Sequence, residues 1–350
     1  MENSPSYKLL IYGANGYTGQ LICEEAARQG LQPVLAGRSE YSIAQLAEKY
    51  GWAYRIFSLD TVEAIADQLC DIMVVLHAAG PFRFTAKNMI EACMQKGIHY
   101  LDITGEMEVF AIANGMHQKA LQKNIMLMPG TGFDVVPTDC MALNLKEKMP
   151  DATSLELAFV TLGGQISHGT AMSMSEKLGE GGASRIDGKI IREPIGFKGK
   201  TLSLYGKKYK VMSIPWGDVY TAYHTTGIGN IRAYTGTIPL TFNLLKLQAL
   251  FNPVLRSGWF KKWLQKKINA APAGPSPEKR EKAITYVWGE VTNATGKKLS
   301  DHFKCPDGYT LTALASVEIA KRVLNGDWKP GYHTPAGCYG ASLMEDFKKV

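Results

Sequence analysis

The stretch Lys8-Leu9-Leu10-Ile11-Tyr12-Gly13-Ala14-Asn15-Gly16-Tyr17-Thr18-Gly19 decides the fold of this 350-residue chain. An apolar, strand-like run leads into glycines spaced G-x-x-G-x-x-G, and a helical pattern follows over 20–29. Such glycines permit a tight turn and close approach of the backbone to a pyrophosphate, which the free N–H groups at the helix start attract. The stretch therefore predicts the first β-turn-α unit of a dinucleotide-binding domain. The predicted cofactor contacts in this turn are Gly13, Asn15, Gly16, Tyr17, Thr18 and Gly19. On this motif alone, a glycine-rich turn in another kind of α/β protein is the alternative.

The end of the second predicted strand indicates which dinucleotide is bound. The strand over 33–36 is followed by Gly37-Arg38-Ser39, at the place where such a domain contacts the adenosine ribose. An acidic residue there would accept hydrogen bonds from the ribose of NAD, whereas Arg38 and Ser39 offer a cationic fork and a hydroxyl to a 2′-phosphate. We therefore expect NADP(H) as the cofactor. A solvated surface arginine is the other interpretation of Arg38.

Strand and helix patterns alternate up to about residue 130. Further strands are expected over 53–57, 72–76, 98–101 and 125–128, and helices over 61–68, 85–96 and 109–123. Asp60, after the strand expected over 53–57, is a further expected cofactor contact. This alternation predicts parallel βαβ units. Beyond Pro137 longer β-like runs appear, over 155–161 and 208–213, and ten glycines lie between 163 and 206. A second α+β domain is therefore expected there, with a strand over 283–292 and a helix over 310–325.

Length and composition exclude several classes of protein. A chain of 350 residues usually forms two domains, and 45% hydrophobic with 20% charged residues is ordinary for a globular protein. Six cysteines without a C-x-x-C pair suggest neither a metal site nor a disulfide framework. The polar start at 1–6 and the lack of a long apolar stretch predict neither a signal peptide nor a membrane span. We expect a cytoplasmic protein with reduced thiols.

The net charge of +7 is concentrated in one region. Residues 246–282 carry nine cationic side chains, interleaved with Phe251, Trp259, Phe260 and Trp263. Such a segment can rest on an anionic membrane through residues 246–267. The favoured alternative is a helix whose aromatic side chains pack inward while its lysines are solvated. Nucleic-acid binding is not expected, since no binding module accompanies the charge.

Four further strings join the glycine turn in a family resemblance. They are His77-Ala78-Ala79-Gly80-Pro81-Phe82, Tyr100-Leu101-Asp102-Ile103-Thr104-Gly105-Glu106, the run 130–139 that starts Gly130-Thr131-Gly132-Phe133-Asp134, and the run 331–340 with Thr334-Pro335-Ala336. In order and spacing the chain resembles the saccharopine dehydrogenase-like oxidoreductases, and among them the trans-acting enoyl reductase branch. The similarity covers nearly the whole chain and thins between 180 and 260.

The resemblance implies a fold and a reaction class. It implies an α/β fold in which an N-terminal NAD(P)-binding Rossmann domain, 1–136 with 326–350 returning to it, carries an inserted α+β mixed-sheet substrate domain over 137–325. It also implies NAD(P) chemistry on a C=N or C=C bond. The segment Ala79-Gly80-Pro81-Phe82 then passes the nicotinamide, and Thr104 and Gly105 lie at the carboxyl edge of the sheet. The chain departs from the expected family pattern at Ser167-His168-Gly169-Thr170 and at Asp307-Gly308-Tyr309.

Hydride transfer needs a proton donor, and the sequence leaves four candidates. Asp102 and Glu106 follow a buried strand, where burial can raise a carboxyl pKa. The alternative for both is to cap the helix that begins at Val109 or to hydrogen-bond the neighbouring loop. His77 precedes the turn at the cofactor, with a core role as its alternative. His168 lies in a glycine-flanked loop of the substrate domain. Asp134 and Tyr223 are expected substrate contacts.

Three hypotheses follow. The first is an NADPH-dependent reductase of an activated double bond, enoyl before imine, in a fairly apolar substrate. The second is a reductase or dehydrogenase of amino-acid imines, although Arg185, Arg192, Arg232 and Arg256 form no visible cluster for a dicarboxylate. The third is a non-catalytic NADP-binding protein on a membrane or lipid surface. The expected partner is a small molecule, with a lipid-like or carrier-bound form and a homodimer left open.

Overall fold

The computed structural model describes residues 9–245 and 248–347, which divide into two compact units. The first unit comprises the chain up to Asp134 together with Gly308–Cys338. The second comprises Val135–Asp307 and the residues from Tyr339 onward. No described helix combines the length and the apolar character needed to cross a membrane.

The first unit is built on a seven-stranded parallel sheet with the order β15-β6-β5-β4-β1-β2-β3. Its strands are β1 (Leu9–Tyr12), β2 (Val34–Gly37), β3 (Tyr54–Ile56), β4 (Val74–His77), β5 (His99–Asp102), β6 (Met126–Met128) and β15 (Gly331–Tyr332). The first six confirm the strands predicted from the sequence. Strand order reverses between β1 and β4, and a dinucleotide binds at such a switch point.

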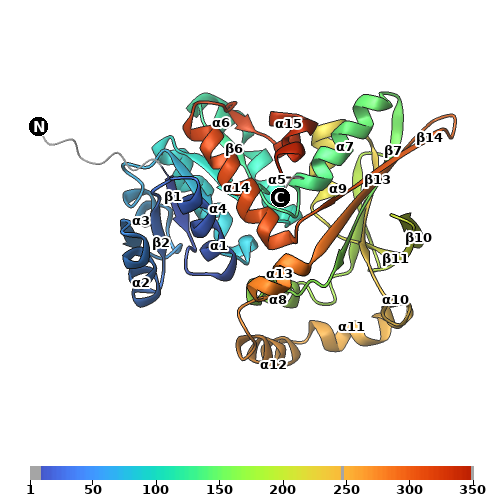
Figure 1. Ribbon diagram of the computed structural model, residues 1–350, viewed down its shortest axis with the longest axis horizontal. Coiled ribbons are helices and arrows are strands. Elements are labelled where there is room, and N and C mark those ends of the chain that lie inside the picture. Colours follow the sequence, from blue (N-terminus) through green and yellow to red (C-terminus); the bar gives the residue numbers. More distant parts are fainter. Residues whose placement is uncertain (1–8, 246–247, 348–350) are drawn as a thin grey trace, which may run out of the picture. The chain divides into compact units, whose positions relative to one another are not determined.

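Helices accompany these strands, and most of them connect consecutive strands, as parallel pairing requires. They are α1 (Tyr17–Arg28), α2 (Glu40–Tyr50), α3 (Val62–Asp67), α4 (Phe82–Lys96), α5 (Met107–Gly115), α6 (His117–Lys123), α14 (Gly308–Leu324) and α15 (Pro335–Tyr339). The single helix predicted over 109–123 is in fact two helices, α5 and α6, which meet at Met116. Figure 1 shows α14 next to α1, although nearly 300 residues separate them in the sequence.

The position of α14 moves the domain boundaries away from the predicted ones. The sequence placed 310–325 in the substrate domain and returned only 326–350 to the first domain. In the structure α14 packs against α1, β4 and β5 and belongs to the first unit, because its buried side chains, such as Leu311 and Ile319, need that cover. The 3₁₀ helix η1 (Ala341–Asp346) instead packs on α7 (Val136–Lys148) in the second unit.

The second unit is built on an eight-stranded mixed sheet. Its main order is β10-β11-β12-β7-β13-β14, and the β8-β9 hairpin pairs with β12. The strands are β7 (Ala152–Leu162), β8 (Gly182–Ile186), β9 (Lys189–Glu193), β10 (Gly199–Leu204), β11 (Lys207–Ile214), β12 (Asn230–Gly236), β13 (Ile284–Asn293) and β14 (Lys298–Cys305). Only the β12–β7 pair is parallel among these. The strands predicted over 155–161, 208–213 and 283–292 are confirmed as β7, β11 and β13.

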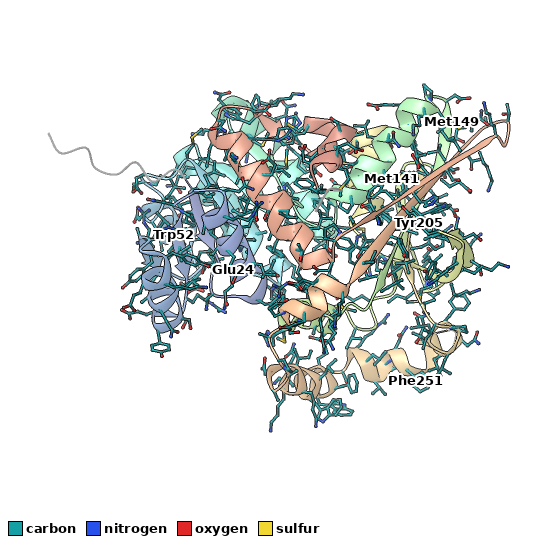
Figure 2. All side chains as sticks on the ribbon, in the orientation of Figure 1. Glu24, Trp52, Met141, Met149, Tyr205 and Phe251 are labelled. Carbon is teal, nitrogen blue, oxygen red and sulfur yellow. The ribbon has the colours of Figure 1, made fainter. Side chains whose placement is uncertain are left out.

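One face of this sheet carries the core and the other carries a helix. Side chains of β7, β10, β11, β12 and β13 form a buried cluster around Tyr234 and Trp288. On the opposite face α7 packs on β13, where a Cβ added to Gly289 would lie 2.7 Å from Met141. Figure 2 labels Met141 on this helix. The remaining helices are α8 (His168–Glu176), α9 (Asp218–Thr226), α10 (Pro239–Leu245), α11 (Gln248–Arg256), α12 (Gly258–Asn269) and α13 (Pro277–Lys282).

Candidate functional site

The glycine turn after β1 lies against the end of β4. Gly13 has a φ of +83°, and a Cβ added to it would lie 2.9 Å from the Cβ of Ala79. Its amide donates to the carbonyl of Ala36, at the end of β2, at 2.8 Å. A Cβ on Gly19 would lie 2.1 Å from the carbonyl oxygen of Gly13. Only glycine fits at these two positions, because backbone atoms leave no room for a side chain.

The N-terminus of α1 has the properties of an anion site. Gly16 is its N-cap without a side-chain cap, and the first turn, with Tyr17 and Thr18, holds no acidic residue. The N–H groups of this turn and the helix dipole therefore favour a negative charge. Asn15 lies beside the end of β2, with its Oδ1 3.2 Å from a Cβ added to Gly37. The predicted pyrophosphate contacts thus share one turn, and their arrangement fits a dinucleotide.

The ends of β1, β2 and β3 bring the expected ribose contacts together. Tyr12 donates its hydroxyl to the carbonyl of Phe57 at 2.9 Å, and burial raises the pKa of Tyr12 to about 12. The charges of Arg38 and Asp60 act on the same hydroxyl, so both side chains lie near it. Arg38 is exposed. Ser39 is the N-cap residue of α2 and pairs its hydroxyl with Ser42 at 2.9 Å.

Glu106 holds the segment that follows β4. Its carboxylate accepts hydrogen bonds from the amides of Phe82 at 3.0 Å and Arg83 at 3.1 Å, which are the first residues of α4. The sequence left open that Glu106 caps a helix, but the expected helix was the one beginning near Val109. The structure shows instead that it caps α4, which comes earlier in the chain. The segment it fixes is Ala79-Gly80-Pro81-Phe82, with a cis Gly80–Pro81 bond and with Thr85 donating to the carbonyl of Ala79 at 2.8 Å.

Asp102 organises two loops at the carboxyl edge of the sheet. Its Oδ1 accepts from the amides of Thr104 at 2.9 Å and Gly130 at 2.8 Å, and its Oδ2 accepts from the hydroxyl of Tyr100 at 2.7 Å. The side chain is fully buried, and this burial raises its pKa to about 7. Every carboxylate oxygen is thus engaged by the protein itself. This geometry favours a role in positioning loops over contact with a substrate.

His77 lies in an aromatic surrounding within the sheet. Its Nδ1 is 3.2 Å from the hydroxyl of Tyr100, and the rings of Tyr12 and Phe82 pack against it. Burial lowers the pKa of His77 to about 3, so the ring is neutral near pH 7. Within the described residues its Nε2 has no hydrogen-bond partner. This geometry favours the core role, the alternative that the sequence left open.

The loops after β5 and β6 meet beside the start of α14. Asp134 is the last residue of the first unit, and its Oδ2 would lie 2.5 Å from a Cβ added to Gly105. The amide of Phe133 donates to the hydroxyl of Thr312 at 3.0 Å. At the same end of α14 the ring of Tyr309 packs edge-on against Tyr17, with centroids 5.1 Å apart. Sequence reasoning missed Tyr309 as a neighbour of the glycine turn and Thr312 as a neighbour of the loop after β6, although Asp307-Gly308-Tyr309 stood out as a departure from the family.

The remaining predicted residues belong to the second unit and have separate partners there. His168 begins α8, and its Nε2 lies 2.8 Å from the Oδ1 of Asn269 at the end of α12. Tyr223 lies on α9 with its ring 4.2 Å from the guanidinium carbon of Arg185. That buried arginine also donates to the carbonyls of Val219 and Gly188.

Comparison with known protein families agrees with the geometry of the first unit. The family described as saccharopine dehydrogenase NADP binding domain matches residues 9–128. Residues 9–128 are therefore similar to the NADP-binding domain of saccharopine dehydrogenases. The glycine turn, Arg38 and the segment after β4 all lie inside the matched region.

Relatives extend the similarity beyond that domain. A saccharopine dehydrogenase-like oxidoreductase of Homo sapiens is 29% identical over 178 residues, which cover 45% of this chain and 41% of that protein. This match therefore spans less than half the length of the human relative. The Pongo abelii protein of the same name aligns at 25% identity over 97% of this chain and 94% of its own. A Mycobacterium tuberculosis protein named as a trans-acting enoyl reductase is 28% identical over 185 residues, covering 49% and 44%.

A solved structure shares the fold of the whole chain. Saccharopine dehydrogenase (L-Glu forming) from Saccharomyces cerevisiae, in its apo form, superposes with a TM-score of 0.68 at 13% identity. The match covers 98% of this chain and 97% of the yeast chain. The parallel sheet and the mixed sheet therefore both belong to a known architecture.

Proposed function

We propose that this protein is an NADPH-dependent reductase of an activated carbon–carbon double bond. The observation that carries the proposal is the uncapped N-terminus of α1, without acidic residues in its first turn, in a domain where Arg38 follows β2. An arginine at that point suits the 2′-phosphate of NADPH, which an acidic residue would repel. The pyrophosphate would lie on the amides of Tyr17, Thr18 and Gly19.

NADPH, once bound, would supply a hydride for the β-carbon of the double bond, and the π electrons of that bond would move onto the activated α-carbon. The protein must then deliver one proton to that carbon. Glu106 and Asp102 are committed to hydrogen bonds that fix the segment after β4 and the loops after β5 and β6. We therefore propose His168 as the proton donor, since its imidazole is half-buried and held by one neutral partner, Asn269.

Three arginines of the second unit support an enoyl substrate over an amino-dicarboxylate imine, whereas Arg192, on β9, is exposed. Recognition of two carboxylates requires arginines with free guanidinium groups. Arg232 is paired with Glu193 at 2.8 Å, Arg256 donates to the carbonyl of Gly179 at 2.6 Å, and Arg185 is bonded to backbone carbonyls. The name of the Mycobacterium tuberculosis relative points the same way. A lipid-like or carrier-bound enoyl group is the form of substrate that we propose.

The test is consumption of NADPH by the purified full chain. We expect oxidation with 2-enoyl thioesters and none with mixtures of an oxo acid and an amino acid, which form imines. Oxidation with the imine mixtures alone would establish the imine reductase instead. Tight NADPH binding without turnover of any substrate would favour a non-catalytic NADP-binding protein.

The proposed role of His168 can be tested with a matched control variant. His168→Ala should lower kcat about 100-fold or more and leave the Kd for NADPH unchanged. Asn269→Ala removes the same tie between α8 and α12 but keeps the imidazole. An equal fall in both variants would show that the tie matters and that His168 is not the proton donor.

A further inference from the structure

Helices α10, α11 and α12 follow one another in a row along one edge of the second unit (Figure 1). Seven of the twenty exposed large hydrophobic side chains of the described residues lie in or directly before these helices, between positions 238 and 263. They are Ile238, Leu240, Leu244, Phe251, Val254, Trp259 and Trp263. Residues 246 and 247, where the predicted membrane-contact segment starts, lie outside the described residues. Single exposed apolar residues are ordinary, whereas a cluster of this kind marks an interaction surface.

Each of the three helices is anchored by one face and exposes apolar residues on another. In α10, Phe242 contacts Gly199 of β10, while Leu240 is 66% exposed. In α11, Gln248 bonds to both backbone groups of Ile195, while Phe251, labelled in Figure 2, is 53% exposed. The exposed apolar side chains therefore form a surface on helices whose other faces are held against the second unit.

In the last helix, α12, the side chains are oriented differently from the arrangement that we favoured from the sequence. That arrangement had the aromatic side chains packed inward and the lysines solvated. Instead Lys261 donates to the carbonyl of Glu176 on α8, and Gln265 bonds to its carboxylate. Trp259 is 67% exposed and Trp263 is 51% exposed. These residues, one helical turn apart, share the outer face with the exposed lysines at 262, 266 and 267.

The charge of this segment has one sign. From residue 219 to residue 277 the sequence contains no Asp or Glu, and positions 238–277 contain six Lys or Arg. Tryptophan side chains prefer the boundary between headgroups and acyl chains, and lysines beside them attract anionic lipid.

We propose that the outer faces of α10, α11 and α12 bind an anionic lipid bilayer, with Trp259, Trp263, Phe251 and the leucines of α10 inserted among the headgroups. This membrane face, as we name it, would hold the protein at a lipid surface without a spanning helix. The proposal does not depend on the reductase activity, because it rests on the second unit alone.

The test is flotation of the full chain with vesicles of phosphatidylcholine, with and without phosphatidylserine. We expect binding to the phosphatidylserine vesicles, at least about tenfold weaker binding to pure phosphatidylcholine, and loss of binding with rising salt. Trp259→Ser combined with Trp263→Ser should weaken partition at least about tenfold. Brominated lipid should quench the tryptophan emission of the wild type and not of this variant.

Two control variants make the same kinds of substitution on surfaces outside the membrane face. Ile190→Ser with Ile191→Ser removes two exposed apolar side chains of β9, and Lys119→Glu with Lys123→Glu reverses two exposed charges of α6. Both should bind vesicles as the wild type does, whereas Lys262→Glu with Lys266→Glu should not. Absence of wild-type binding, or equal binding by the double tryptophan variant, would overturn the proposal. So would a lipid-free dimer that this variant dissociates, because a second copy would then cover the face.

Discussion

Arg38 is the residue on which the choice of cofactor depends. Its side chain is exposed after β2 and carries the charge that a 2′-phosphate requires. Arg38→Asp should raise the Kd for NADPH about 100-fold, because an attraction becomes a repulsion, and should change the Kd for NADH little. Fluorescence titration measures both constants. Lys49→Asp, on the exposed end of α2, makes the same charge change away from the site and is the control. Equal losses for NADPH and NADH would contradict the assignment.

Three candidate proton donors show which properties of a single residue can be predicted from the sequence. The position of Asp102, Glu106 and His77 at the carboxyl ends of strands was predictable, because parallel strands all end at one edge of the sheet. Their partners were not predictable. Glu106 bonds to amides 23 and 24 residues away, and Asp102 bonds to the loop at Gly130. Such contacts depend on how neighbouring βα units pack, which no local pattern records.

At the scale of elements, α4 depends on a cap supplied from another connection. Glu106→Ala should lower the free energy of unfolding by about 1 to 2 kcal/mol and raise the KM for NADPH, because the segment 79–82 loses its support. Denaturant unfolding and cofactor titration measure the two effects. Glu91→Ala removes a carboxylate of α4 whose ion pair with Lys87 is long and exposed, and it should change neither quantity. A variant Glu106→Ala as stable as the wild type would contradict the capping role.

The elements themselves were largely predictable, and their grouping was only partly so. Alternating short apolar runs and helical patterns predicted six of the seven strands of the parallel sheet, because five of the six are buried on both faces. The strand β15 has two residues and leaves no such pattern. Helix α14 was predicted as a helix, yet its packing on α1 follows from long-range contacts. Tyr309 therefore reached the neighbourhood of Tyr17 unforeseen.

At the scale of the whole molecule, the buried groups of the first unit make stability depend on pH in opposite directions. Burial lowers the pKa of His77 to about 3 and of His99 to about 4. Their contribution is present above the ordinary histidine pKa of 6.5 and is lost as pH falls toward these values, because the unfolded chain takes up the protons first. The contribution of Asp102 changes with pH in the other direction, because its pKa in the folded protein, about 7, lies above the ordinary value of 3.8. It is present at low pH and is lost as pH rises.

The variant Asp102→Asn separates the effect of the aspartate on the pH dependence of stability from the effect of the two histidines. The asparagine Oδ1 can keep the amides of Thr104 and Gly130, and its NH₂ can donate to Tyr100. The wild type is favoured by the buried protonated carboxyl below pH 3.8 and loses this contribution as pH rises through about 7. The free energy of unfolding of the variant, relative to the wild type, should therefore rise across this window by up to roughly 4 kcal/mol and stay constant above it. Urea unfolding of both proteins at a series of pH values measures the difference, and the histidine contributions cancel in it. If the difference does not change across this window, the pKa of Asp102 in the folded protein is no higher than its ordinary value of 3.8, and its hydrogen bonds offset the cost of burial.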